Sequence, residues 1–154
     1  MNPEQALLRH ARDDPRALPV FVPVLASPMA AALRARIARV DAATHRVEVD
    51  FEPGPEFVQG AGVVLGGAVA AILDLTMSYA AMASLADGLA VATATLNVSF
   101  LGAAHVGVLR ATGEVERTDR RMVFAAARVC DAEGRLVATA SSALAVTEWR
   151  DPSV

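Results

Sequence analysis

The chain has 154 residues, of which 54% are hydrophobic and 20% are charged, and its formal net charge is -3. This length suits one domain, and so apolar a composition excludes an intrinsically disordered chain. The acidic balance excludes attraction of the whole molecule to nucleic acid or anionic membranes, and the single cysteine, Cys130, excludes an intrachain disulfide.

Residues 1–32 are predicted to form a short helix and a proline-rich connector. Asn2 followed by Pro3 is typical of a helix start, and we expect this helix to end near Arg12. Its charged residues interrupt the apolar stretch that a secretory signal needs, so a cytoplasmic protein is expected. Four prolines between residues 15 and 28 then break regular structure.

The main domain is predicted to span residues 33–147, with residues 148–154 as a C-terminal tail. It begins with two strands, expected at 33–40 and 46–51. In the second strand apolar residues alternate with charged ones, which is the period-two pattern of a strand with one buried face. Prolines and glycines end this strand and lead towards the next element.

Residues 69–85 are predicted to form the only long helix. This segment contains no proline or glycine and is apolar nearly all round, so it must be covered on every side. A sheet that curls around it, together with a second subunit, would provide that cover. A membrane span is not expected, because Asp74 would lie near its centre and the usual basic anchors are missing from its flanks.

Four more strands are predicted at 92–100, 106–117, 121–130 and 135–147. The first of them alternates between apolar and polar residues, and the last two are joined by a turn of hairpin composition. The order of helix, two strands, long helix and four strands indicates an α+β fold with a mostly antiparallel sheet.

Asp74 is the first candidate catalytic residue, since its neighbours on the helix supply no opposite charge. A carboxylate is rarely buried without a partner or a task, and it can act as a general base. Ser78, four residues later on the same helical face, could orient the carboxylate or a water molecule. The alternative is a structural aspartate that is bonded to a nearby hydroxyl or faces a solvent cleft.

Gly66 and Gly67 precede the helix and form a candidate oxyanion site. Backbone amides in the first turn of a helix have no internal acceptor, and glycine lets a substrate carbonyl approach them. The alternative is a plain tight turn. Gly66 and Asp74 are 74 - 66 = 8 residues apart, or roughly 12 Å along a helix axis. If both act on one substrate, they must come from different subunits, so the active unit is at least a dimer.

Arg117, Arg120 and Arg121 form a basic cluster near a predicted turn. Such clusters are usually solvated surface charges, but this one could also clamp a phosphate group.

The pattern Gln59-x-x-Gly62-x-x-Leu65-Gly66-Gly67 followed by Asp74 resembles the signature of hotdog-fold acyl-CoA thioesterases of the phenylacetate-degradation type. The likeness spans residues 33–147 and includes the strand at 95–101. It implies a hotdog fold, in which an antiparallel sheet wraps around one long central helix.

The resemblance also implies a role for each matching residue. Asp74 would be the catalytic carboxylate, acting as base on water or as nucleophile, and the Gly66 amide would be the oxyanion donor. Gln59 would help to hold the thioester carbonyl, and Ser78 would lie near the attacking water. The residues expected to contact substrate are Leu65, Gly67, Met77, Arg120 and Arg121, the two arginines at the CoA nucleotide.

Leu65 departs from the family pattern, because histidine is usual at this position and leucine can neither hydrogen-bond nor carry charge. Hydratase or dehydratase chemistry is therefore not expected, since it needs an acid and a base together. Hydrolysis remains possible.

The sequence thus predicts a cytoplasmic thioesterase that acts on an aryl- or medium-chain acyl-CoA as a homodimer or homotetramer. No metal or redox cofactor is implied, and neither is a nucleic-acid or membrane partner. Two alternatives stay open: a protein that binds acyl ligands without turnover, and a purely structural member of an assembly. The acyl group is not determined by the sequence.

Overall fold

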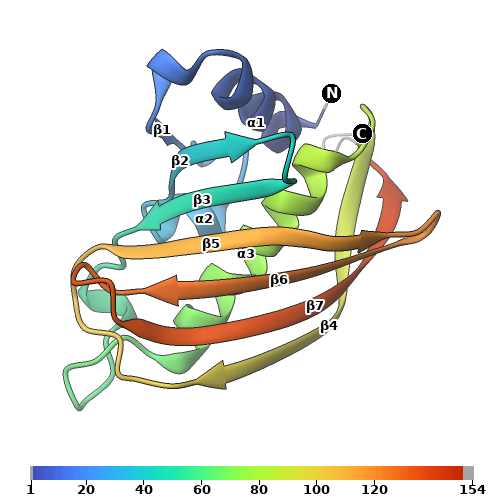
Figure 1. Ribbon diagram of the computed structural model, residues 1–154. Helices are drawn as coiled ribbons and strands as arrows, with labels where there is room; N and C mark the ends of the chain where they lie inside the picture. Colours follow the sequence, from blue (N-terminus) through green and yellow to red (C-terminus); the bar gives the residue numbers. More distant parts are fainter. Residues whose placement is uncertain (1, 151–154) are drawn as a thin grey trace.

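A computed structural model describes residues 2–150, which form an antiparallel sheet curved around one long helix (Figure 1). The helices are α1 (Pro3–Asp13), α2 (Pro28–Ala32) and α3 (Gly66–Ser84), with 3₁₀ turns η1 (Pro15–Ala17) and η2 (Pro55–Phe57). The strands are β1 (Val20–Phe21), β2 (Arg36–Asp41), β3 (Arg46–Phe51), β4 (Leu89–Phe100), β5 (Leu109–Thr118), β6 (Met122–Cys130) and β7 (Leu136–Glu148).

The seven strands lie in the order β1-β2-β3-β5-β6-β7-β4, and every neighbouring pair is antiparallel. Strand β4 follows α3 in the chain but lies at the far edge of the sheet, where β7 is its only neighbour among the strands of residues 2–150. Its other edge therefore has unpaired backbone groups, which are available to another strand. The predicted α+β hotdog architecture is confirmed.

Helix α3 packs against the concave face of the sheet and contacts β3, β4, β5, β6 and β7. It comes close to β5 at Gly113, where an added Cβ would lie 2.7 Å from the carbonyl oxygen of Thr76. Only glycine allows the backbones to come so near. Among the described helices α3 alone is long and apolar enough to cross a membrane, and 56% of its most apolar window is buried inside the protein.

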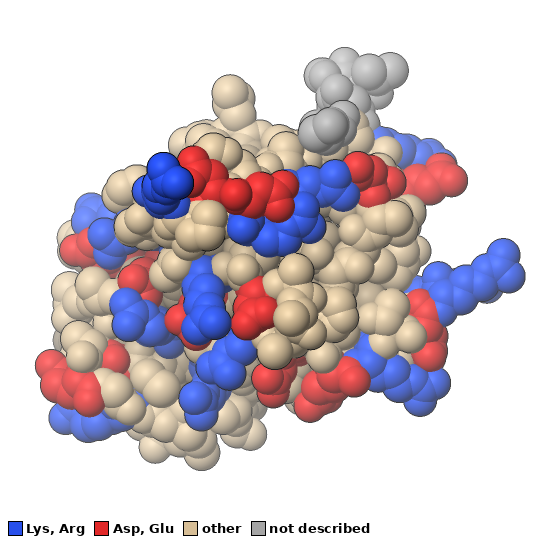
Figure 2. All heavy atoms as spheres, turned by 45° about the horizontal axis from the view of Figure 1, so that its top comes forward, with Lys and Arg blue, Asp and Glu red and all other residues tan. Residues whose placement is uncertain are grey.

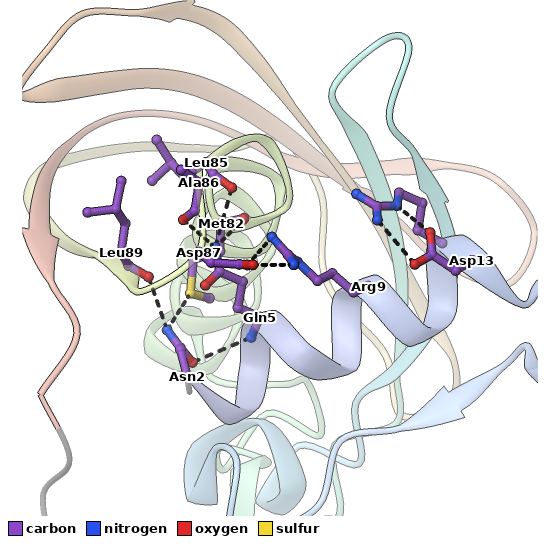
Figure 3. Close-up of polar contacts among 10 residues, drawn as sticks. Asn2, Gln5, Arg9, Asp13, Met82, Leu85, Ala86, Asp87 and Leu89 are labelled. Carbon is purple, nitrogen blue, oxygen red and sulfur yellow. Dashed lines mark hydrogen bonds and ion pairs between the residues drawn. The ribbon is translucent and has the colours of Figure 1, made fainter.

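Helix α1 is fixed to the C-terminal end of α3 by two buried side chains (Figure 3). The Asn2 side chain caps α1 and also donates to the Leu89 carbonyl oxygen at 3.5 Å. The Gln5 amide donates to the carbonyl oxygens of Met82, Leu85 and Ala86 at 3.4, 3.4 and 2.9 Å. These carbonyls have no partner within α3, so Gln5 supplies the cap that the sequence of α3 lacks.

The N-terminal region is more ordered than the prediction of a proline-rich connector. Strand β1 pairs with β2, and α2 forms at the end of the predicted connector, just before the position where the first strand of the main domain was expected. That strand begins at Arg36 instead of residue 33, since Arg34 has a positive φ of 51° that ends α2 with a sharp turn. Most of the predicted tail, residues 151–154, lies outside the described residues.

Strand β4 contains a bulge that the period-two pattern did not reveal. Thr93 pairs with Leu144 and Thr95 pairs with Ala143, so Ala94 is an extra residue in the ladder. An extra residue reverses the alternation of side chains. Thr93 therefore faces α3, although the predicted alternation placed it on the face opposite to Phe100. The strand is also largely exposed in the single chain, where the sequence predicts a half-buried one.

Ionic side chains of both signs are interspersed on the face shown in Figure 2, without one large patch of a single sign. Elsewhere on the sheet Arg110 of β5 is paired with Asp50 of the neighbouring β3 through bonds of 2.7 and 3.0 Å. Such surface pairs contribute little to stability.

Candidate active site

One side of α3 is not covered by the sheet, and we call it the open stripe. Its members are spaced three or four residues apart on one helical face, while their neighbours are buried in the core. The open stripe consists of Gly67, Ala70, Ala71, Asp74, Leu75 and Ser78. The prediction of a helix covered on every side is thus only partly met within a single chain, and a strip that includes Asp74 remains accessible.

Asp74 lies in the middle of the open stripe and is half-buried. The hydroxyl of Thr93 donates to its Oδ1 atom at 2.8 Å. This bond is possible only because the β4 bulge turns Thr93 towards the helix. The carboxylate is therefore held in one orientation, while Oδ2 has no hydrogen-bond donor among residues 2–150 and can address a water or a substrate atom.

Ser78 lies one helical turn beyond Asp74 and is also half-buried. Together with Leu75 it borders a groove of about 380 Å³ between α3, the start of β4 and the N-terminal segment. Helix geometry places Ser78 about 6 Å along the axis from Asp74, so one extended ligand can reach both.

The N-terminus of α3 exposes backbone donors at Gly66 and Gly67. The Leu65 carbonyl oxygen accepts from Ala68 and Val69 at 2.9 and 3.1 Å, so the helix's first hydrogen bonds begin one residue after Gly67. Among the described residues neither glycine N–H has a protein acceptor. Free amides at this end of a helix dipole are suited to stabilise a negative oxygen.

Little space separates Gly66 from the ring of Phe100 at the end of β4. An added Cβ at Gly66 would meet the ring at 3.4 Å, which is ordinary contact, and at Gly67 it would meet only the Leu65 side chain at 3.9 Å. Phe100 was not predicted as a site residue, although its ring forms a wall next to the candidate oxyanion amide. The side chain of Leu65 is 54% exposed beside these amides, at the position where the resemblance leads us to expect histidine.

Gln59 lies in the loop between η2 and α3, with its side chain exposed. A tight turn orders this loop: Gly62 N–H donates to the Gln59 carbonyl at 2.9 Å, and the Gln59 N–H donates to Val63 at 2.9 Å. The turn needs the positive φ of 77° that Gly62 adopts. The spacing between Gln59 and Gly62 therefore has a structural reason, and the turn leaves the Gln59 side-chain amide exposed.

The remaining predicted residues are spread over the fold. Met77 is completely buried in the core and does not border the groove beside Ser78. Arg120 and Arg121 are exposed in the turn between β5 and β6. Across the sheet, that turn lies close to the strand position that contacts Asp74. Val123, just after the turn, pairs with Leu144, and Leu144 pairs with Thr93, which is bonded to Asp74.

One chain does not assemble all the predicted groups around a single point. Gly66 and Asp74 occupy the same helix two turns apart, as their spacing requires. Thr93 is the functional candidate that sequence reasoning missed, and no signal in the sequence could have identified it. The alternation of side chains along β4 predicts that Thr93 lies on the face opposite to Phe100, and only the bulge at Ala94 turns it towards Asp74.

The family model described as Thioesterase superfamily matches residues 61–138, which include α3, β4, β5, β6 and the start of β7. Among the curated proteins none matches the sequence significantly.

Solved structures with similar folds extend the match to nearly the whole chain. A phenylacetic acid degradation-related protein from Ralstonia eutropha is 30% identical, with a TM-score of 0.79, and the match covers 94% of this chain and 99% of that one. A thioesterase family protein from Silicibacter pomeroyi is 27% identical, with a TM-score of 0.75 and coverage of 82% and 93%. A Bacillus halodurans protein solved with CoA is 25% identical, with a TM-score of 0.62 and coverage of 65% and 66%.

Proposed function

This chain belongs to the thioesterase superfamily and is a thioester hydrolase, and we propose that its substrate is an aryl- or medium-chain acyl-CoA. The resemblance to hotdog thioesterases of the phenylacetate-degradation type is confirmed. The observation that carries the finer proposal is the Asp74 carboxylate, which is oriented by Thr93 on the open stripe of α3. A cytoplasmic location is part of the same proposal.

Asp74 acts on the thioester in one of two ways. As a general base it takes a proton from water while the water oxygen attacks the carbonyl carbon. As a nucleophile its own oxygen attacks that carbon, and water then hydrolyses the resulting anhydride. In both routes the carbonyl oxygen becomes negative, the carbon–sulfur bond breaks, and CoA leaves as a thiolate that regains a proton.

The backbone N–H of Gly66 stabilises the oxyanion, since it is a free donor at the positive end of α3. Gln59 supports the same carbonyl through its exposed side-chain amide, and Ser78 helps to place the attacking water. Gly67 and Leu65 line the approach to this donor.

A homodimer completes the site in our proposal. The unpaired edge of β4 supports pairing of two subunits through this strand, which would cover its exposed apolar side chains. The Gly66 amide of one subunit would then serve the Asp74 of the other. Whether dimers associate further into tetramers is left open.

The CoA nucleotide is proposed to bind near Arg120 and Arg121, whose exposed guanidinium groups can pair with phosphates. The Bacillus halodurans neighbour solved with CoA supports a CoA ester as the substrate. Met77 affects the acyl site only from within the core, by its packing under the open stripe.

Purified protein assayed with a panel of acyl-CoA thioesters and a thiol reagent tests this function. We expect CoA release from at least one aryl or medium-chain ester, and its loss in Asp74→Ala. Release that survives this substitution would refute the role of Asp74. Saturable binding of every ester without release would favour the alternative of a binding protein.

A single turnover in ¹⁸O-labelled water distinguishes the two routes. With Asp74 as base, the label enters the product acid directly. With Asp74 as nucleophile, water that attacks the aspartyl carbon of the anhydride leaves the label in the side chain and an unlabelled aspartate oxygen in the product acid. Mass spectrometry of the protein detects that label, which the base route cannot produce.

A further inference from the structure

Strand β4 divides its side chains between the two faces of the sheet. Those that lie opposite buried residues of β7 face α3, and those between them face the outer surface. Leu96, Val98 and Phe100 face α3, as does Thr93 on the other side of the bulge. Asn97 lies between Leu96 and Val98 and faces outwards, where it is exposed.

The bulge leaves Ala94 without a paired position of its own. Thr93 and Thr95 lie opposite consecutive residues of β7, so they occupy consecutive positions along the ladder. The same holds for a strand that pairs with the outer edge of β4, which lies at the border of the sheet in Figure 1.

Two β4 strands can pair about a two-fold axis in only a few registers. Opposite residues of an antiparallel pair face the same side of the sheet, so a symmetric pair must place one residue opposite its own copy. Successive registers of this kind shift the partner strand by two residues, or roughly 7 Å. A requirement that two groups meet at one small substrate group therefore selects a single register.

The proposed active site supplies this requirement. Thr93 is bonded to Asp74 at 2.8 Å, whereas the ring of Phe100 lies beside Gly66 at the other end of the strand. One thioester carbonyl can reach Asp74 and Gly66 of the partner subunit only if Phe100 of the partner subunit lies near Thr93.

Pairing of Asn97 with its own copy meets this requirement. Thr95 then lies opposite Ser99 of the partner subunit. Because Ala94 takes no position in the ladder, the next pair is Thr93 and Phe100 of the partner subunit. Both side chains of this pair face α3, which they do only because the bulge turns Thr93 to that side.

The same register matches the chemistry of the other pairs. On the α3 side Leu96 lies opposite Val98 of the partner subunit, so two apolar side chains that a single chain leaves accessible cover each other. On the outer side Thr95 lies opposite Ser99 of the partner subunit, and two hydroxyl side chains form a favourable cross-strand pair.

We propose that Phe100 acts in the active site of the partner subunit, as a specificity-determining residue for the acyl group. Opposite residues have Cβ atoms about 5 Å apart, so the ring adjoins the bonded Thr93 and Asp74 of one subunit while it covers Gly66 of its own. The thioester carbonyl lies between these groups, and its α-carbon meets the ring. This inference rests on the proposed function, since the position of the thioester determines the register.

The ring limits the bulk of the acyl group next to the carbonyl. An α-carbon that is a CH₂ group, as in linear acyl and arylacetyl groups, fits beside the ring. A branched α-carbon, or an aryl ring bonded directly to the carbonyl, collides with it. The acyl class is thereby narrowed to thioesters with an unbranched α-carbon.

Hexanoyl-CoA and its isomer 2-ethylbutanoyl-CoA test this inference, because they differ only in branching at the α-carbon. Phe100→Ala should raise the branched-to-linear ratio of kcat/KM by about 10-fold, since it frees the space of a ring. Phe100→Tyr keeps the ring and should keep the wild-type ratio. So should Phe21→Ala, the matched control, which removes an exposed ring from β1 at the opposite edge of the sheet. An unchanged ratio in Phe100→Ala would overturn the role of Phe100.

Two heterodimers, purified through different tags, show which subunit's Phe100 serves a given Asp74. The first carries Asp74→Asn and Phe100→Ala in the same subunit, so its remaining Asp74 faces the substituted position of the partner and should give the ratio of Phe100→Ala. The second carries the two substitutions in different subunits and should give the wild-type ratio. The reverse result would overturn action across the interface. An Asp74→Asn homodimer as active as the wild type would instead refute the proposed function.

A crosslink tests the register without any hydrolysis. Asn97→Cys in a Cys130→Ala background, which has no other cysteine, should form a disulfide-linked dimer under mild oxidation, because opposite Cα atoms are about 5 Å apart. Ser99→Cys in the same background is the control, since its two copies would lie four residues apart, or roughly 13 Å. A dimer linked through Ser99→Cys, or none through Asn97→Cys, would overturn the register and the position of Phe100. An Asn97→Cys dimer of a protein that hydrolyses no ester would support the register and count only against the proposed function.

Discussion

Thr93 determines how the Asp74 carboxylate is presented to a substrate. Its hydroxyl occupies Oδ1 at 2.8 Å and leaves Oδ2 free on the open stripe. In the proposed reaction Oδ2 takes the proton or attacks the carbonyl, so Thr93 is a positioning residue and Asp74 the catalytic one. Their removal should therefore have unequal effects.

Asp74→Asn should lower kcat by about 100-fold or more, since it removes the base or nucleophile while keeping the shape of the side chain. Thr93→Val should lower kcat by about 10-fold, because the carboxylate remains but is no longer held. Steady-state kinetics on the best acyl-CoA of the panel measures both. Loss of activity in Thr93→Val with none in Asp74→Asn would contradict these assignments.

Leu65→His restores the residue that the family usually carries beside the helix N-terminus. The side chain at this position is 54% exposed, so we expect the substitution to fold normally. An imidazole N–H near the Gly66 and Gly67 amides would add a donor for the oxyanion, and kcat should rise by up to about 10-fold. Leu65→Gln serves as a control that adds an amide donor without an ionisable ring. No rise in either variant would show that the site does not use a side-chain donor here.

At the scale of elements, α3 packs so closely against β5 at Gly113 that only glycine fits there. The Cβ that alanine would add at Gly113 would lie 2.7 Å from the Thr76 carbonyl oxygen and 3.0 Å from its side chain. The backbone of a buried helix cannot shift locally to make room for this methyl group. An alanine at this position therefore has to push α3 and the sheet apart.

Gly113→Ala should lower the free energy of unfolding by about 2 kcal/mol or more, in line with the cost of overpacking. Gly60→Ala is the matched control, because an added Cβ there meets nothing within 4 Å and its φ is not positive. Urea denaturation followed by circular dichroism measures both variants. Equal stabilities would show that the sheet accommodates the extra methyl group.

The elements differ in how well their sequences predicted them. Periodicity and composition predicted α3, six of the strands and the turn at 131–134. Each of these elements leaves its pattern within a short stretch of sequence, because one of its faces is buried and the other is not. The β4 bulge and the pairing of β1 with β2 were not predicted, since both depend on partners distant in the chain. The motif predicted Asp74 and Gly66 as candidates, whereas Thr93 became a candidate only in the fold, because its contact with Asp74 depends on a bulge in a distant strand.

At the scale of the whole molecule, the open stripe and β4 leave apolar surface uncovered in a single chain. Leu96 and Phe100 on β4 are 37% and 55% exposed, and Leu65 lies exposed at the start of α3. Contiguous apolar surface next to an unpaired strand edge is typical of a subunit interface. The proposed dimer buries this surface and brings two halves of the site together.

Leu96→Glu should weaken the dimer, because it places a charge within the proposed β4 interface. Sedimentation velocity is expected to give a dimer or tetramer for the wild type and a larger monomer fraction for the variant, with a parallel loss of activity. Glu substituted for the exposed Leu136, outside β4, is the control. A monomeric and fully active wild-type protein would refute assembly through β4.

The most direct test of a shared active site is a heterodimer purified through two different tags, with Asp74→Asn in one subunit and Gly66→Pro in the other. Proline is well tolerated at the first position of a helix and removes the N–H that the oxyanion needs, and its Cβ would meet the Phe100 ring at an ordinary contact distance of 3.4 Å. If the groups come from different subunits, one site of the heterodimer carries both lesions and the other carries none. Its activity should then be about half that of the wild-type dimer, while both parent homodimers are nearly inactive. A heterodimer as inactive as its parents would mean that each site takes Asp74 and Gly66 from the same subunit, which contradicts the account.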